Sequence, residues 1–129
     1  MIVVDASALL GALLRTPLAR AATRWLFDSG ETPHAPHLID VEVAQTLRRH
    51  VARGEMDELR RAALADLADF PLRRHAHQIF LPRAWELRHN FTAYDAIYVA
   101  LAEALDAPLL TLDRRLAATA REHTGVALI

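Results

Sequence analysis

The most informative absence from this 129-residue chain is that of cysteine. Without Cys there is no disulfide and no thiolate metal site, so any metal ion must be held by oxygen or imidazole ligands. The same absence fits a reducing compartment. Lysine is missing too, since all fifteen basic residues are Arg, and the formal net charge is only −1. Because there is no global positive field, contact with a polyanion would depend on local patches.

Long apolar runs are also absent. Asp5 interrupts the apolar run at the N-terminus, and no basic leader precedes that run, which predicts neither a signal peptide nor a membrane span. We expect a cytoplasmic protein without membrane contact. With 53% hydrophobic residues, the chain is long enough for one domain with a real core and too short for two. Residues 1–129 are therefore expected to form a single domain.

Short apolar runs alternate with segments of helical composition. Helices are predicted at residues 7–14, 18–28, 39–53, 57–68, 75–89, 93–105 and 114–122. Strands are predicted at residues 2–4, 34–36, 109–112 and 126–129, with a further candidate within 70–74. This alternation favours an α/β fold with a mostly parallel sheet of four to five short strands, covered on both faces.

The segment 75–89 is the least regular of the predicted helices. It contains Pro82, which must lie near a helix start or at a kink because it has no N–H to donate. A helix is nevertheless favoured because Ile79, Trp85 and Leu87 need burial.

Two carboxylates follow predicted strands. Asp5 ends the first strand and Asp113 ends the strand at 109–112, and each precedes a helix. If these strands are parallel neighbours, both side chains lie beyond the carboxyl ends of the strands, where α/β sheets bind ligands. The alternative is structural, since Asp is also a preferred N-cap residue.

Two further acids lie in the first turns of predicted helices. They are Glu42 and Asp95. Thr92 with Asp95 forms a capping-box pattern, and Glu42 favours a helix N-terminus, so each again has a structural explanation. Four acids at one sheet edge would repel one another and raise their pKa values unless a cation compensates. Hard oxygen ligands indicate Mg²⁺ or Mn²⁺.

Four segments of the chain resemble the four acidic motifs of PIN domains, and most of all those of the VapC toxins of VapBC toxin–antitoxin modules. The resemblance covers the whole chain in order. The segments are Val3-Val4-Asp5-Ala6-Ser7, Val41-Glu42-Val43-Ala44 with Leu47-Arg48-Arg49 after it, Thr92-Ala93-Tyr94-Asp95-Ala96, and Leu110-Thr111-Leu112-Asp113-Arg114-Arg115-Leu116.

This resemblance implies a three-layer α/β/α domain with Mg²⁺- or Mn²⁺-dependent endoribonuclease activity, the toxin of a type II toxin–antitoxin pair. It makes Asp5, Glu42, Asp95 and Asp113 catalytic acids and metal ligands, with Asp5 and Asp95 binding the ion directly. The implied reaction is hydrolysis of RNA phosphodiester bonds by a water that the ion activates. The implied partners are RNA, a VapB-type antitoxin that covers the acidic cleft, and a second copy of the chain.

Three further residues are candidates for binding substrate. Ser7 and Thr111 match small hydroxyl positions beside the acids in the family and are assigned to orienting a carboxylate, a water or a phosphate. Their alternative is a plain hydroxyl at a helix start or a strand end. Arg114 is a candidate because it follows Asp113.

Other polar groups receive the simpler interpretation. The basic groups at 48–50, 60–61 and 73–75 could guide RNA phosphates, but solvated helix faces offset by nearby acids are favoured. The seven His residues lack the i, i+4 spacing of a helical zinc pair and are assigned to surface or packing roles.

Two other classes of function stay open. A catalytically weak PIN-like module would use the same acids mainly to bind a partner protein. A phospho-accepting receiver-like domain also gathers acids at the ends of parallel strands, but it needs a catalytic Lys, which this chain lacks.

Overall fold

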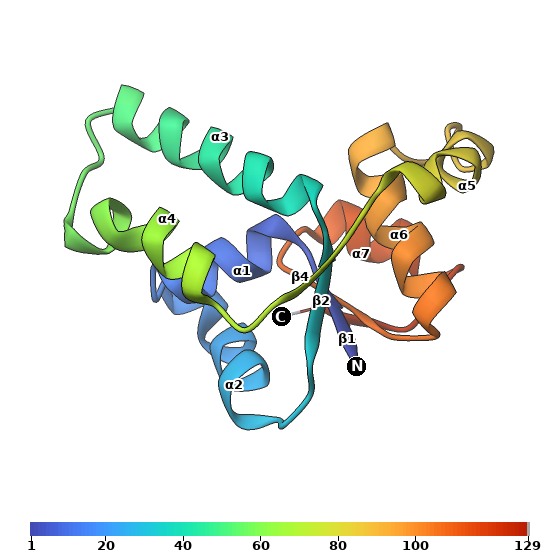
Figure 1. Ribbon diagram of the computed structural model, residues 1–129, viewed down its shortest axis with the longest axis horizontal. Coiled ribbons are helices and arrows are strands. Elements are labelled where there is room, and N and C mark those ends of the chain that lie inside the picture. The colour runs from blue at the N-terminus through green and yellow to red at the C-terminus, as the bar shows by residue number, and fades with distance from the viewer. Residues whose placement is uncertain (129) are drawn as a thin grey trace.

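A five-stranded, all-parallel sheet forms the centre of the computed structural model, which describes residues 1–128 (Figure 1). The strand order is β3-β2-β1-β4-β5. The strands are β1 (Ile2–Val4), β2 (Pro33–Pro36), β3 (Arg73–His75), β4 (Leu109–Thr111) and β5 (Val126–Leu128). The predicted α/β class with a mostly parallel sheet is confirmed.

Helices pack on both faces of this sheet. They are α1 (Ala6–Leu13), α2 (Arg20–Asp28), α3 (Leu38–Ala52), α4 (Glu58–Asp69), α5 (Leu81–Glu86), α6 (Ala93–Leu105) and α7 (Arg114–Ala120), with short 3-10 turns η1 (Pro17–Ala19) and η2 (Gln78–Phe80). The first four helices lie on one side of the sheet, and α5 and α6 lie on the other (Figure 1). None of the helices among residues 1–128 has the length and apolar character needed to cross a membrane.

The central strand β1 positions the site. Its three residues are at most 1% exposed, as expected for a parallel strand covered on both faces. Val3 lies opposite His34 of β2 and Leu109 of β4. The Asp5 N–H continues the ladder by donating to the Leu110 carbonyl at 3.1 Å. Asp5 therefore lies at the carboxyl end of β1, directly beside the end of β4.

The predicted single helix over 75–89 is wrong. His75 ends strand β3, and Pro82 lies in the first turn of the short helix α5, where its missing N–H costs nothing. Ile79 and Trp85, for which burial was expected, are 73% and 69% exposed, and only Leu87 of that set is buried. The other predicted elements occur with small shifts at their ends. The last predicted strand extends to residue 129, which lies outside the described residues.

Two histidines on neighbouring strands pack against each other. His34 of β2 is 3% exposed, and its Nδ1 lies 2.8 Å from Nε2 of His75 at the end of β3. Burial, followed by the charges of nearby basic groups, lowers the pKa of both imidazoles. The burial of His34 and the stacking of its ring on that of His75 fit the packing role assigned to the histidines from sequence.

Gly11 allows α1 to approach its neighbours closely. A Cβ on Gly11 would lie 2.7 Å from Ala19 Cβ and 2.9 Å from Leu112 Cδ1. Ala19 and Leu112 belong to η1 and to the segment after β4, so this glycine fixes the spacing between α1 and both segments. The approach also shapes one wall of the cavity described below.

We predict that Gly11→Ala lowers the free energy of unfolding by about 1–3 kcal/mol, because the added methyl overpacks a closed wall. Alanine's higher helix propensity offsets this loss by about 1 kcal/mol at most. Urea denaturation measures the difference. The matched control is Gly125→Ala, whose Cβ would meet Pro108 Cβ at an ordinary 3.6 Å. A urea midpoint for Gly11→Ala that equals the control's would contradict the prediction.

Candidate functional site

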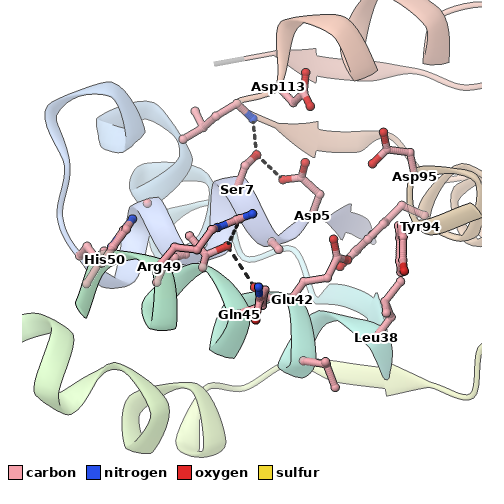
Figure 2. Close-up of a pocket in the computed structure, with 18 of the residues that line it drawn as sticks. Asp5, Ser7, Leu38, Glu42, Gln45, Arg49, His50, Tyr94, Asp95 and Asp113 are labelled. Carbon is pink, nitrogen blue, oxygen red and sulfur yellow. Dashed lines mark hydrogen bonds between the residues drawn. The ribbon is translucent and has the colours of Figure 1, made fainter. Parts of the chain in front are cut away.

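All four predicted acids line one cavity of about 890 Å³ (Figure 2). It opens beyond the carboxyl ends of β1 and β4. Asp5 and Asp113 reach it from the ends of these two strands, Glu42 from α3, and Asp95 from the first turn of α6. Side chains separated by up to 108 positions are thus brought together.

The Asp5 carboxylate is buried and held in one orientation. It is 6% exposed and accepts hydrogen bonds from Ser7 Oγ at 2.7 Å, from the Ala8 N–H at 2.9 Å and from Thr111 Oγ1 at 2.5 Å. Burial raises its pKa to about 6, and the nearby Asp95 charge adds to the rise, while the three hydrogen bonds oppose it. The predicted N-cap role is also real, because the Ala8 bond caps α1.

The hydroxyls of Ser7 and Thr111 connect Asp5 to the chain after β4. Ser7 Oγ accepts from the Leu112 N–H at 3.0 Å, and Thr111 Oγ1 accepts from the Asp113 N–H at 2.9 Å. Of the roles considered from sequence, orienting a carboxylate fits both side chains. Direct contact with a substrate does not fit Thr111, which is 0% exposed.

Glu42 contributes a buried oxygen without a partner. Among the described residues, neither its Oε1 nor the Tyr98 hydroxyl makes a hydrogen bond, although the two groups lie near each other. Burial raises the pKa of Glu42; the nearby Tyr98 hydroxyl opposes this rise, and the charges of Asp95 and Asp5 add to it. An unsatisfied buried oxygen costs about 1–3 kcal/mol. The position beside Glu42 Oε1 therefore suits a hydrogen-bond donor or a cation.

Asp95 and Asp113 face each other across the mouth of the cavity (Figure 2). Burial and then the charge of Asp113 raise the pKa of Asp95. Both residues also take part in the helix capping that the sequence predicted. The Asp95 N–H donates to Thr92 Oγ1 at 3.1 Å, and Asp113 Oδ1 accepts from the N–H groups of Arg115 and Leu116. Capping and site formation are thus compatible roles.

Arg114 is exposed and does not line the cavity, so the structure gives no support to its assignment as a substrate-binding residue. Its neighbour Arg115 is the one whose charge lowers the pKa of Asp95. Sequence reasoning missed Tyr98, Arg49 and His50 as cavity residues. Helical spacing was the available signal, because Tyr98 lies three positions after Asp95 and Arg49 lies seven after Glu42.

The oxygen atoms in the acidic part of the cavity are the type of ligand that a hard divalent cation prefers, and their negative charge suits it. Carboxylates and hydroxyls are present, and the three acids with raised pKa values repel one another in the absence of a cation. Among residues 1–128, however, no three Asp, Glu or His side chains are arranged to hold an ion together as they stand. The four acids share a cavity without converging on one point.

Residues 2–122 match the PIN domain family. The chain belongs to that family. It is 47% identical over 118 residues to Ribonuclease VapC1 of Mycobacterium tuberculosis (strain H37Rv), covering 90% of this chain and 88% of that protein. It is 41% identical to Ribonuclease VapC9 of the same strain over 130 residues, covering 100% and 98%. The crystal structure of PAE2754 from Pyrobaculum aerophilum aligns with a TM-score of 0.72 at 23% identity, covering 97% and 87%, which supports the fold of this PIN domain.

We predict that Asp5→Asn stabilises the metal-free PIN domain at pH 7.5 by about 1–3 kcal/mol. Folding raises the pKa of Asp5 from 3.8 to about 6, so the folded protein binds the extra proton between these values. The free energy of unfolding therefore falls as the pH rises from about 4 to about 6 and stays reduced above that range. Asparagine keeps the N-cap and removes the charge.

Urea denaturation in EDTA at pH 4 and pH 7.5 measures this difference. The advantage of Asp5→Asn should be present at pH 7.5 and absent at pH 4. Asp66→Asn, on the exposed face of α4, is the control and should change stability by no more than about 0.5 kcal/mol. A variant that is less stable than the parent at pH 7.5 would show that burial of the Asp5 charge carries no net cost.

Proposed function

We propose that this PIN domain is a Mg²⁺- or Mn²⁺-dependent endoribonuclease, the toxin of a type II toxin–antitoxin pair. The observation that carries the proposal is the gathering of Asp5, Glu42, Asp95 and Asp113 around one cavity, with raised pKa values for the first three. The ribonuclease names of relatives that are 40–47% identical over most of the chain support the same activity.

Asp5 and Asp95 are the proposed direct ligands of the ion, and Glu42 and Asp113 bind it directly or through water. When bound, the ion supplies positive charge that stabilises a phosphoryl oxygen and lowers the pKa of the attacking water. Asp95, Glu42 and Asp113 must move toward the fixed Asp5 carboxylate to share it, because the acids are not arranged for this as they stand. The orphaned Oε1 of Glu42 gains a partner in that rearrangement.

The protein's own groups have separate tasks in this proposal. Ser7, Ala8 and Thr111 fix the direction of the Asp5 carboxylate, so that it need not reorganise when substrate arrives. Glu42 takes the proton of the attacking water, since burial has brought the pKa of its carboxyl upward, toward the range that suits a general base. Tyr98 closes the cavity floor and keeps bulk water from Glu42.

The partners that follow from this function are RNA, a cognate VapB-type antitoxin and a second copy of the chain. We propose that the antitoxin places a basic side chain among the carboxylates, where it neutralises the same charge as the ion. We expect the protein to act in the cytoplasm, where its RNA substrates lie. The alternative is a catalytically weak module with the same acidic cavity, which would bind its partner without cleaving RNA.

We predict that the purified protein, free of partner, cleaves RNA in Mg²⁺ or Mn²⁺, loses activity in EDTA and regains it when the ion is restored. Asp95→Asn and Asp5→Asn should each lower the cleavage rate by about 100-fold or more, the order contributed by such groups. Gel analysis of a labelled RNA measures the rate, with Asp66→Asn as the control. Full activity in either site variant would refute the assignment, and partner binding without cleavage would favour the alternative.

We predict that the cognate antitoxin displaces bound Mn²⁺. A cationic side chain among the acids competes electrostatically with the ion, so the signal of free Mn²⁺ in electron paramagnetic resonance should rise as antitoxin is added. Antitoxin with Gln in place of the basic residues of its cleft-covering segment is the control and should leave Mn²⁺ bound. Unchanged metal occupancy with the unmodified antitoxin counts against this form of inhibition.

A further inference from the structure

One face of α3 runs along the whole cavity. The α3 residues that line it recur every three or four positions and are Leu38, Val41, Glu42, Gln45, Thr46, Arg49 and His50. This spacing places them in one stripe of the helix. Glu42 and Arg49 are seven positions apart, which is about 10 Å along the helix axis at about 1.5 Å per residue. Figure 2 shows His50 at the opposite end of the cavity from Asp95, with the Arg49 guanidinium between His50 and the acids.

His50 is held in one tautomer from outside the cavity. Arg60 Nε donates to His50 Nδ1 at 3.1 Å, and because guanidinium groups only donate, this nitrogen is the acceptor. The proton of the neutral ring is therefore on Nε2. Arg60 is fixed in turn by Asp57, whose Oδ2 lies 2.6 Å from its Nη1, and its side chain is 21% exposed. This arrangement makes Nε2–H a donor whose direction is set in advance.

Arg49 keeps most of its donors free. Its Nη2 donates to Thr46 Oγ1 at 3.3 Å, and it makes no ion pair with any carboxylate of residues 1–128. The adjacent Arg48 differs, because its Nε donates to Gln45 Oε1 at 3.0 Å and its side chain does not line the cavity. The basic group 48–50, assigned from sequence to a solvated face, is thus divided by the helix into one outward and two inward residues.

We propose that Arg49 and His50 form a phosphate-binding subsite for the RNA strand, away from the bond that is cut. This inference rests on the proposed ribonuclease function and specifies how its substrate is held. A guanidinium group and an imidazole N–H are suitable donors to phosphate oxygens, and such contacts position a strand without reading its sequence. They also supply local attraction that a chain of net charge −1 otherwise lacks. Arg60 is a positioning residue that acts through His50.

Arg49→Gln and Arg48→Gln form a matched pair for testing the subsite. For a labelled oligoribonucleotide of about a dozen nucleotides, Arg49→Gln should raise KM about 10-fold, as expected for a lost charged hydrogen bond, and leave kcat nearly unchanged. The slope of log KM against log salt should become shallower by about 0.7, the value for one phosphate contact on a single strand. Arg48→Gln should match the parent protein in both quantities. Equal KM values for the two variants would overturn the subsite.

Substrate length gives a second criterion. A dinucleoside monophosphate has one phosphodiester and cannot reach both ends of the cavity, so Arg49→Gln should cleave it as fast as the parent protein does. A loss of cleavage with this short substrate would show that Arg49 acts at the reacting phosphate or on the fold, and would overturn the proposed role.

Binding measurements separate this inference from the proposed function. Fluorescence anisotropy with the same oligoribonucleotide in Ca²⁺ or Mg²⁺ reports affinity whether or not the RNA is cut. Weaker binding by Arg49→Gln alone, without cleavage by any protein, would support the subsite and refute the enzyme. Cleavage by the parent protein, Arg49→Gln and Arg48→Gln with identical KM values would support the enzyme and refute the subsite. Absence of both binding and cleavage in the parent protein would refute both.

The role of Arg60 is tested through the His50 ring. Long-range ¹H–¹⁵N spectra should show the Nε2–H tautomer in the parent protein and a mixture of tautomers in Arg60→Ala. The same variant should raise KM for the long substrate and not for the dinucleoside monophosphate. A parent protein with the proton on Nδ1 would overturn the assignment of His50.

Discussion

Burial of carboxylates in one shared cavity is the constraint on which the rest of this structure depends, and repulsion between the acids adds to its cost. Asp5 is almost fully buried. Its hydrogen bonds from Ser7, Ala8 and Thr111 offset only part of the free energy that burial costs the ionised carboxylate. Glu42 faces the same cavity, and its Oε1 has no hydrogen-bond partner of ordinary geometry among the described residues. The fold tolerates this arrangement because β1 and the apolar faces of α1 and α6 are packed around it. The ionised carboxylates in the cavity thus lower the stability that the rest of the core provides.

The cavity has opposite charges at its two ends because each element contributes according to its geometry. Parallel strands end at one edge, so Asp5 and Asp113 meet there whatever the helices do. Helix α3 runs away from that edge and carries the functional face from Glu42 to Arg49. The face of α3 that lines the cavity therefore carries basic side chains at one end and lies beside the acids at the other.

The sequence predicted the elements whose signals are local. The β-branched run before Asp5 and the Thr92–Asp95 cap are patterns of a few residues, and both occur as predicted. The features that depend on tertiary packing were harder to predict from the sequence. Strand β3 is built from charged residues, since it lies at the sheet edge, where Arg74 pairs with Asp40 at 2.8 Å. Which side of α3 faces the cavity could be stated only once its neighbours were placed, so Arg49 could not be told from Arg48.

The hydroxyl bridge from Asp5 through Thr111 to the start of α7 joins the first strand of the chain to the fourth. During synthesis on the ribosome, the nascent polypeptide carries Asp5, Glu42 and Asp95 long before β4 can insert beside β1. The acidic cavity therefore cannot be completed until the part of the chain that carries Thr111 and Asp113 has been synthesised.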